Sequence, residues 1–322
     1  MSGRGVLRVV AGLYGRPGAA LQAAGKAWGL LRAGGAGAVL RAARRKVAEP
    51  TLPVSDAAEA PAGPLPAVLL RPAPVPPWCT RLSVTAVIPT RGRQDLLAPC
   101  LDSMAATLPA AARLQVVVVN NGGGVAAPAG FPYPVALRPE HRPFNWSVYN
   151  NDAVADAGSD FLLFLNDDVR ALHPGWLDAM LAAAREPATG PVGAVLLYAD
   201  GRIQHAGIAV DEGGATFHEG KLEPGTGLVP GPDDPASRPA FAVTGACLLV
   251  ATEAFRRLGG FEPALALSFN DVDFCLRAAA AGLGSRVALH ARLVHLETRT
   301  RPLALDPREE RLFRARLAGG AG

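Results

Sequence analysis

Between residues 84 and 197, short apolar runs alternate with longer segments of helical periodicity. The runs at 84–88, 116–119, 161–165 and 192–197 are expected to be strands, and the segments at 94–107, 145–157 and 173–185 helices. This alternation predicts an α/β fold with a mostly parallel central sheet and helices on both faces. Beyond residue 200 the pattern is looser, with a strand expected at 243–250, helices at 252–258 and 270–281, and a strand-like run at 285–289.

Dense prolines before residue 81 mark a domain boundary. Residues 49–80 are rich in Pro and Ala and end in four closely spaced prolines, which cannot build a helix or a central strand. We therefore expect a linker over 49–80. It would join a basic, partly helical N-terminal arm over 1–48 to a main domain over 81–301, with a C-terminal tail over 302–322.

The basic charge of the chain lies in the arm. The formal net charge is +4, but the first 50 residues hold nine Lys or Arg against one acid, Glu49, so the remaining residues carry a net charge of −4. This acidic body disfavours nucleic acid as a partner. The arm either lies on an anionic membrane surface, at about 1 kcal/mol per basic residue, or is a solvated segment.

Cysteine usage and hydropathy suggest the compartment. The four cysteines are far apart and form no C-x-x-C pair, which disfavours a disulfide framework or a zinc site and suits a reducing cytosol. No apolar run reaches the roughly 18–20 residues of a spanning helix, and the N-terminus lacks a signal-peptide pattern. We expect a cytoplasmic protein, peripheral at the inner face of the cell membrane if the arm binds lipid.

Two adjacent carboxylates, Asp167 and Asp168, follow Asn166 directly after the strand expected at 161–165. Ligands of α/β sheets bind beyond the carboxyl ends of the strands. Adjacent carboxylates repel each other unless a cation neutralises them, and their oxygens suit Mg²⁺ or Mn²⁺, which can also bridge a diphosphate. The alternative is a turn that caps the next helix, where Asp and Asn are common.

A second acidic cluster begins the helix expected at 270–281. Asn270 as N-cap and Asp273 three positions later form a near capping box, which accounts for these two residues. Asp271 is left unexplained by helix capping and is therefore a candidate general base.

A third polar cluster starts at His295. A lone histidine is usually structural, but an imidazole near two carboxylates can complete a metal shell. Arg299 and Arg301 either neutralise phosphate oxygens or belong to a solvated basic tail.

Taken in order, these segments resemble glycosyltransferase family 2, whose members have a GT-A fold. The resemblance spans about residues 82–301 and rests on residues 88–93, 101–103, 161–169, 200–207, 243–247, 259–261, 269–277 and the segment from His295. The stretch Gln-His-Ala-Gly at 204–207 is similar to a rhamnosyltransferase-like bacterial branch that acts on surface polysaccharides.

The resemblance implies roles for individual residues. Asn166 and Asp168 occupy the D-x-D position of the family, with Asp168 on the metal and Asn166 near the donor ribose. Asp271 falls on the general base, and His295 on the residue that often completes the metal site. Pro89, Thr90 and Arg91 match the loop that lines the nucleotide base.

The chain departs from the family pattern at two positions. Asn166 replaces the usual first acid, for which Asp167 or water would compensate. Asn120 stands where an Asp normally contacts the uracil or ribose, which leaves the donor base open.

The resemblance implies an inverting, metal-dependent glycosyltransferase that uses Mg²⁺ or Mn²⁺. It would move a sugar from a UDP- or dTDP-sugar to a hydroxyl of a glycan or lipid-linked glycan, in bacterial surface polysaccharide synthesis. A nucleotidyltransferase would open with a Gly-rich, Lys-bearing phosphate loop, which residues 90–93 only faintly imitate. An inactive scaffold is the other alternative; Asn120 and Asn166 leave room for it, whereas Asp168, Asp271 and His295 argue against it.

Overall fold

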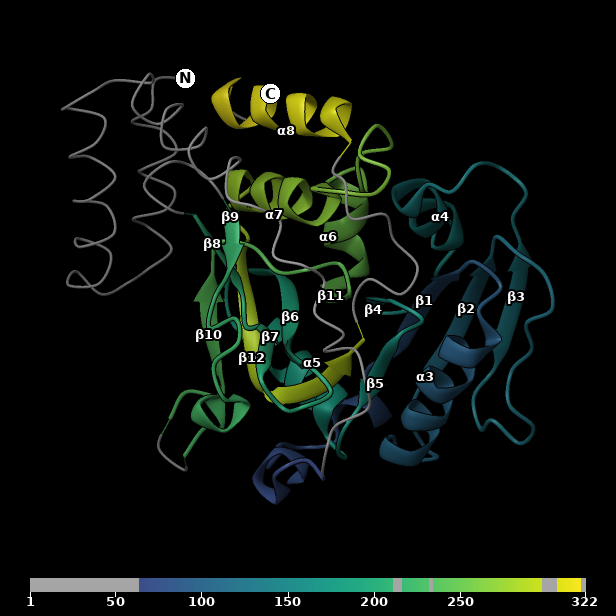
Figure 1. Cartoon of the computed structure of the whole chain (residues 1–322), viewed down its shortest axis with the longest axis vertical. Coiled ribbons are helices and arrows are strands. Elements are labelled where there is room, and N and C mark those ends of the chain that lie inside the picture. The colour runs from purple at the N-terminus through teal and green to yellow at the C-terminus, as the bar shows by residue number, and fades with distance from the viewer. Residues whose placement is uncertain (1–63, 211–215, 232–233, 297–305, 320–322) are drawn as a thin grey trace.

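One large mixed sheet organises the chain. The computed structural model describes residues 64–210, 216–231, 234–296 and 306–319, so the predicted arm over 1–48 lies outside the described residues. The strands follow the order β10-β12-β6-β11-β4-β1-β2-β3, with β5 paired to β12 and β7 to β6 (Figure 1). Their bounds are β1 Val84–Thr90, β2 Leu114–Asn120, β3 Val135–Pro139, β4 Phe161–Leu165, β5 Val169–Ala171, β6 Thr189–Leu197, β7 Ile203–His205, β10 Ser237–Ala240, β11 Cys247–Ala251 and β12 Gly284–His295. A separate hairpin joins β8 Ile208–Val210 to β9 Thr216–His218.

Helices cover both faces of this sheet, as predicted. They are α3 Gln94–Thr107, α4 Trp146–Ala153, α5 Trp176–Ala184, α6 Thr252–Arg257, α7 Asn270–Ala280 and α8 Pro307–Gly319, with short 3₁₀ turns at Ala67–Leu70, Trp78–Thr80 and Gly225–Leu228. Side chains alternate along β1, so Ala86 and Ile88 pack with α3 and α5. Val87 points the other way and packs with α4, α6 and α7.

The α/β class is confirmed, but the sheet is more mixed than predicted. β1 runs parallel to β2 and β4, β2 parallel to β3, and β12 parallel to β6. β11 lies between β6 and β4 and is antiparallel to both. Its residues 247–250 are buried on both faces. An apolar run of this kind is also typical of a parallel strand, so the sequence pattern does not reveal its direction.

Residues 64–80 pack on the domain, which differs from the linker expected over 49–80. Leu69 and Cys79 are buried. Arg292 of β12 is 2% exposed, and its guanidinium donates to the carbonyl oxygens of Leu69 (3.0 Å) and Arg71 (2.7 Å). The prolines therefore shape an extended stretch that is hydrogen-bonded to the sheet.

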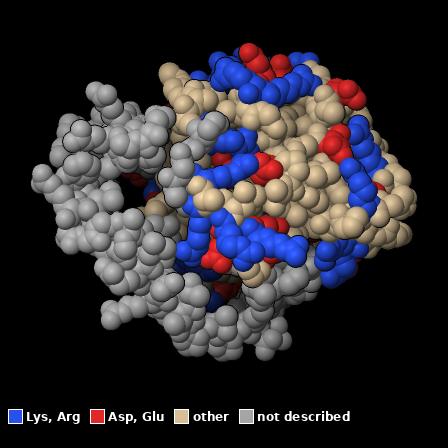
Figure 2. Space-filling view, turned by 90° about the horizontal axis from the view of Figure 1, so that it is seen from above, with Lys and Arg blue, Asp and Glu red and all other residues tan. Residues whose placement is uncertain are grey.

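The expected tail over 302–322 contains α8, which lies beside α7 (Figure 1). Lys and Arg side chains are spread over this end of the molecule, with Asp or Glu beside several of them (Figure 2). One such pair is Arg314 and Glu310, one turn apart on α8 at 2.6 Å. In the described parts of the chain, none of the helices combines the length and apolar character needed to cross a membrane.

Buried His173 predicts that stability falls in acid. It is 1% exposed, its Nδ1 lies 2.9 Å from the carbonyl oxygen of Pro174, and burial lowers its pKa from 6.5 to about 4. Between these pH values the unfolded chain binds a proton that the folded chain does not. The free energy of unfolding should therefore drop by about 3 kcal/mol as the pH falls through this window. His173→Asn, whose amide can still donate to Pro174, should flatten the pH dependence of urea unfolding; an unchanged slope would contradict this assignment.

Candidate active site

A pocket of about 480 Å³ opens at the carboxyl ends of β1 and β4. Eight of the nine predicted site residues line it: Pro89, Thr90, Arg91, Asn166, Asp167, Asp168, Asp271 and His295. The rest of the wall comes from Phe144 and Trp146, from Gln204, Ile208, Thr216 and His218, and from residues 244–246, 267–270 and 272. Segments that are far apart in the sequence thus meet at one place.

Asn120 is the predicted residue that does not line the pocket. It ends β2 opposite Thr90 of β1, and its side-chain oxygen accepts a hydrogen bond from the Gly122 amide at 3.1 Å. The following loop nevertheless passes close to the pocket, because a Cβ at Gly122 would lie 2.5 Å from the carbonyl oxygen of Arg91. Contact between Asn120 and a donor stays a prediction.

The adjacent carboxylates Asp167 and Asp168 are both buried, at 6% and 5% exposure. Burial raises the pKa of Asp167 to about 6; a hydrogen bond with the Thr90 side chain opposes this shift, and the Asp168 charge adds to it. Two buried anions side by side are costly unless a positive charge lies between them. This supports a cation-binding role for the pair.

His295 ends β12 and faces Asp168. Its Nε2 lies 3.2 Å from Asp168 Oδ1 and 3.5 Å from the Asn166 amide nitrogen. The other ring nitrogen, Nδ1, lies 2.5 Å from the side-chain oxygen of Gln204, whose amide nitrogen donates to the His295 carbonyl at 3.0 Å. Because the Gln204 oxygen can only accept, Nδ1 carries the proton. In the neutral form of the ring, the lone pair of Nε2 points toward Asp168, as a metal ligand requires.

These residues fit a cation that is shared with a substrate. Among the residues that the structure describes, no group of three His, Cys, Asp or Glu side chains is placed to hold a metal ion. Asp168 and His295 would supply two ligands. Mg²⁺ commonly binds through one or two carboxylates, with substrate phosphates and water completing its shell. The pair therefore suits a metal that binds together with a diphosphate.

Asp271 lies in the first turn of α7 and faces the pocket. Its carboxylate accepts hydrogen bonds from the backbone amides of Gly245 (2.9 Å) and Val272 (2.8 Å). These contacts fix the carboxylate, and its place in the pocket wall allows it to take a proton from a bound hydroxyl.

The predicted N-cap of this helix is wrong. Phe269 occupies the N-cap position with a left-handed φ of 63°, and Asn270 is the first helical residue. The left-handed turn shifts the helix start by one residue, so Asn270 accepts from the Asp271 amide at 2.8 Å instead of capping. Asp273 is 3% exposed and pairs with Arg277 and Arg316, so its role is an ion pair and not a capping box.

Sequence reasoning gave no role to Gln204, His205 and His218. His205 is fully buried and its Nε2 accepts from the Gly207 and Thr244 amides, at 3.3 and 3.4 Å. Its Nδ1 lies 3.2 Å from Nδ1 of His218, which lines the pocket. Gln204 and His205 are polar residues in the buried strand β7, and this combination is the signal that could have marked the segment as part of a site. Arg299 and Arg301, for which the sequence left open a phosphate contact or a solvated basic tail, lie outside the described residues.

Comparisons with known proteins show the family of this chain. The sequence profile of the family described as "Glycosyltransferase like family 2" matches residues 81–315. The chain is 35% identical over 239 residues to the uncharacterized protein y4gI of Sinorhizobium fredii, covering 72% of this chain and 26% of that protein. It is 34% identical over 227 residues to the O-antigen biosynthesis protein RfbC of Myxococcus xanthus, covering 68% and 18%. The chain thus spans about a quarter and a fifth of the length of these two relatives.

A third relative is shorter. The N-acetylglucosaminyl-diphospho-decaprenol L-rhamnosyltransferase of Mycobacterium tuberculosis is 28% identical over 236 residues, covering 66% of this chain and 76% of that protein.

Solved structures show the same fold at low sequence identity. The GalNAc-T7 structure with UDP, GalNAc and Mn²⁺ aligns with a TM-score of 0.54 at 13% identity, covering 66% of this chain and 44% of that one. The Pyrobaculum calidifontis mannosyltransferase PcManGT, with GDP-Man and Mn²⁺, aligns with a TM-score of 0.50 at 18% identity, covering 73% and 63%. These neighbours confirm the GT-A fold. With a family profile that matches most of the chain, the protein belongs to glycosyltransferase-like family 2.

Proposed function

We propose that this protein is an inverting glycosyltransferase that moves a sugar from a UDP- or dTDP-sugar to a hydroxyl of a glycan or lipid-linked glycan. The observation that carries the proposal is the meeting of Asp168, His295 and Asp271 in one pocket of the family's fold. The names of the relatives, an O-antigen biosynthesis protein and a rhamnosyltransferase acting on a lipid-linked sugar, favour bacterial surface polysaccharide synthesis.

The donor would bind across the ends of β1 and β4. Pro89, Thr90 and Arg91 would face the nucleotide base; the Arg91 guanidinium lies 4.5 Å from the centre of the Phe144 ring, which gives this wall a flat surface. Asn166 would lie near the ribose, with Asn120 and Asp167 as further donor contacts. Asp168 and His295 would hold Mg²⁺ or Mn²⁺, which offsets the charge of the leaving diphosphate when bound.

The chemistry would be a single in-line displacement. The acceptor oxygen forms a bond to the anomeric carbon as the bond to the diphosphate oxygen breaks, and the hydroxyl proton passes to Asp271. A carboxylate is a weak base toward an alcohol, so the proton moves only as the new bond forms and the hydroxyl acidifies. One displacement inverts the configuration at the anomeric carbon and needs no protein nucleophile.

Thermal unfolding with a panel of UDP-, dTDP- and GDP-sugars, in Mn²⁺ or in EDTA, tests the donor site. A donor at 100 times its dissociation constant should add about 2.7 kcal/mol to the free energy of unfolding. A Mn²⁺-dependent shift with one nucleotide would support the proposal and identify the base. No shift with any donor in folded protein would favour a scaffold, and pyrophosphate release from a nucleoside triphosphate would favour a nucleotidyltransferase.

Replacing Gln204 should weaken the metal site without touching a metal ligand. Gln204→Leu removes the oxygen that orients His295, and loss of such a partner typically costs about 10–100-fold in metal affinity. The Mn²⁺ concentration that half-saturates donor binding should rise accordingly. The control is Gln115→Leu on β2, whose side chain bonds Thr85. Equal Mn²⁺ dependence in the two variants would contradict the assignment.

We also propose a cytoplasmic location at the membrane surface. The four cysteines are free and buried, which suits a reducing compartment. A lipid-linked acceptor would be met at the inner face of the membrane, where the basic arm over 1–48 could bind anionic lipid. The acidic charge of residues 51–322 argues against nucleic acid as a partner.

A further inference from the structure

Buried Glu309 of α8 holds the segment that leads into Asp271. The side chain is 4% exposed, and its two oxygens accept hydrogen bonds from three consecutive backbone amides: Ala266 (2.9 Å), Leu267 (3.0 Å) and Ser268 (2.6 Å). Hydrogen bonds to an ionised carboxylate are among the strong ones in proteins. Leu267 and Ser268 line the pocket, so this contact lies directly behind its wall.

A second contact of α8 holds the turn that starts α7. Phe313 lies one turn after Glu309, is 4% exposed and stacks on Phe269, with ring centroids 4.6 Å apart and planes 8° apart. Phe269 has a φ of 63°, where a bulky side chain is a genuine outlier. Such a conformation persists only when neighbouring structure enforces it. The ring of Phe313 and the carboxylate of Glu309 are the parts of α8 that do so.

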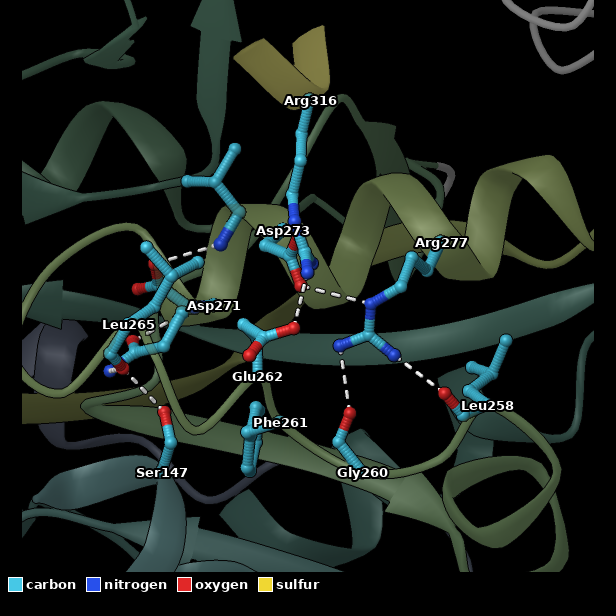
Figure 3. Close-up of polar contacts among 12 residues, drawn as sticks. Ser147, Leu258, Gly260, Phe261, Glu262, Leu265, Asp271, Asp273, Arg277 and Arg316 are labelled. Carbon is cyan, nitrogen blue, oxygen red and sulfur yellow. Dashed lines mark hydrogen bonds and ion pairs between the residues drawn. The ribbon is translucent and has the colours of Figure 1, made fainter. Parts of the chain in front are cut away.

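A third contact ties α8 to both sides of the same loop. Arg316 pairs with Asp273 of α7 at 2.7 Å and with Glu262 at the start of the loop. Asp273 also forms an ion pair with Arg277 at 2.9 Å. The other two guanidinium nitrogens of Arg277 donate to the carbonyl oxygens of Leu258 and Gly260. Figure 3 shows Arg316 reaching down to Asp273 and Glu262, with Asp271 on the same first turn of α7 as Asp273.

We propose that Glu309 is a positioning residue for sugar transfer: through the backbone of residues 266–268 it sets the place of the Asp271 carboxylate opposite Asp168 and His295. The inference rests on the proposed function only in taking Asp271 as the base. Glu309 lies behind the pocket wall and not in it, so it acts through the loop. A displacement of about 1 Å in a reacting group can cost about 100-fold in rate.

Amide hydrogen exchange of the full chain tests the contact without any substrate. In Glu309→Gln one carboxylate oxygen becomes an NH₂ group, so at least one of the three amides loses its acceptor. Exchange over residues 266–268 should become about 10–100-fold faster. The control is Glu310→Gln, the next residue of α8, whose carboxylate pairs with Arg314 and which should leave that exchange unchanged. Unchanged exchange in Glu309→Gln would overturn the proposal.

Release of nucleoside diphosphate tests the consequence for chemistry. The assay uses the donor that stabilises the protein, with octyl N-acetylglucosaminide or water as acceptor. Glu309→Gln should lower kcat at least about tenfold and leave the donor dissociation constant within about twofold. Phe313→Leu, which keeps an apolar side chain, is the second variant and should lower kcat in the same direction.

The combination with Asp271→Asn decides between positioning and a purely structural role. If Glu309 acts through Asp271, the double variant Asp271→Asn/Glu309→Gln should turn over no more slowly than Asp271→Asn alone. Losses that multiply would overturn the proposal. A wild-type protein that releases nothing from any donor would instead contradict the proposed function, while the exchange result would still decide whether Glu309 holds the segment.

Discussion

Asp271→Asn is expected to lower kcat for sugar transfer at least 100-fold while donor affinity stays within about twofold. The amide keeps the size of the carboxylate, and its oxygen can still accept from the Gly245 amide. What it loses is the ability to take the acceptor proton, and general-base help of this kind is typically worth about 10²–10⁴-fold. Steady-state release of the nucleoside diphosphate gives kcat, and calorimetric titration gives the donor dissociation constant.

The pattern of losses distinguishes the roles open to Asp271. Turnover near that of the wild type would remove Asp271 from the base role. A large loss of donor affinity with unchanged kcat would place this carboxylate against the donor instead.

Asp168→Ala is expected to abolish the effect of metal on donor binding. The substitution removes one of two protein ligands, and the metal is expected to supply several kcal/mol of charge stabilisation at the diphosphate. The donor dissociation constant in Mn²⁺ should therefore rise about 100-fold, toward the value that wild type shows in EDTA. Titration of the donor with and without Mn²⁺ measures both numbers.

Asp160→Ala is the matched control for this metal test. Asp160 precedes β4 at the end opposite Asp168, where its carboxylate accepts from the backbone amide and hydroxyl of Ser83. It should leave the Mn²⁺ dependence intact. The same metal dependence in Asp168→Ala and wild type would count against Asp168 as a ligand.

The sequence pattern predicted most helices and strands because these elements depend on residues that are close together in the sequence. The Asn145 side chain caps α4 by accepting from the Val148 amide at 2.9 Å. The strand expected over 243–250 begins only at Cys247. The reason is that the amides of Thr244 and Gly245 donate to the side chains of His205 and Asp271 and so do not pair with a neighbouring strand. The apolar pattern of the sequence does not reveal these side-chain contacts.

The sequence could predict those site residues that lie at the ends of expected strands. Asp168 lies in the short connection between β4 and β5, and His295 ends β12; both reach the pocket. The contact of Gln204 with His295 joins residues 91 positions apart, and it depends on β7 and β12 both pairing with β6. Glu309 lies in the stretch expected as a C-terminal tail, and the sequence does not reveal that its buried carboxylate accepts from the amides of residues 266–268.

The hydrogen bonds of Arg292 show that the folded unit extends beyond the segment that the family profile matches. The match to the family profile begins at residue 81, yet the guanidinium of Arg292 donates to the carbonyl oxygens of Leu69 and Arg71. A chain that starts at residue 81 would lose both acceptors, and a hydrogen bond to a charged group is typically worth about 1.5–3 kcal/mol. The unit that folds therefore includes residues 64–80, although the family profile begins only at residue 81.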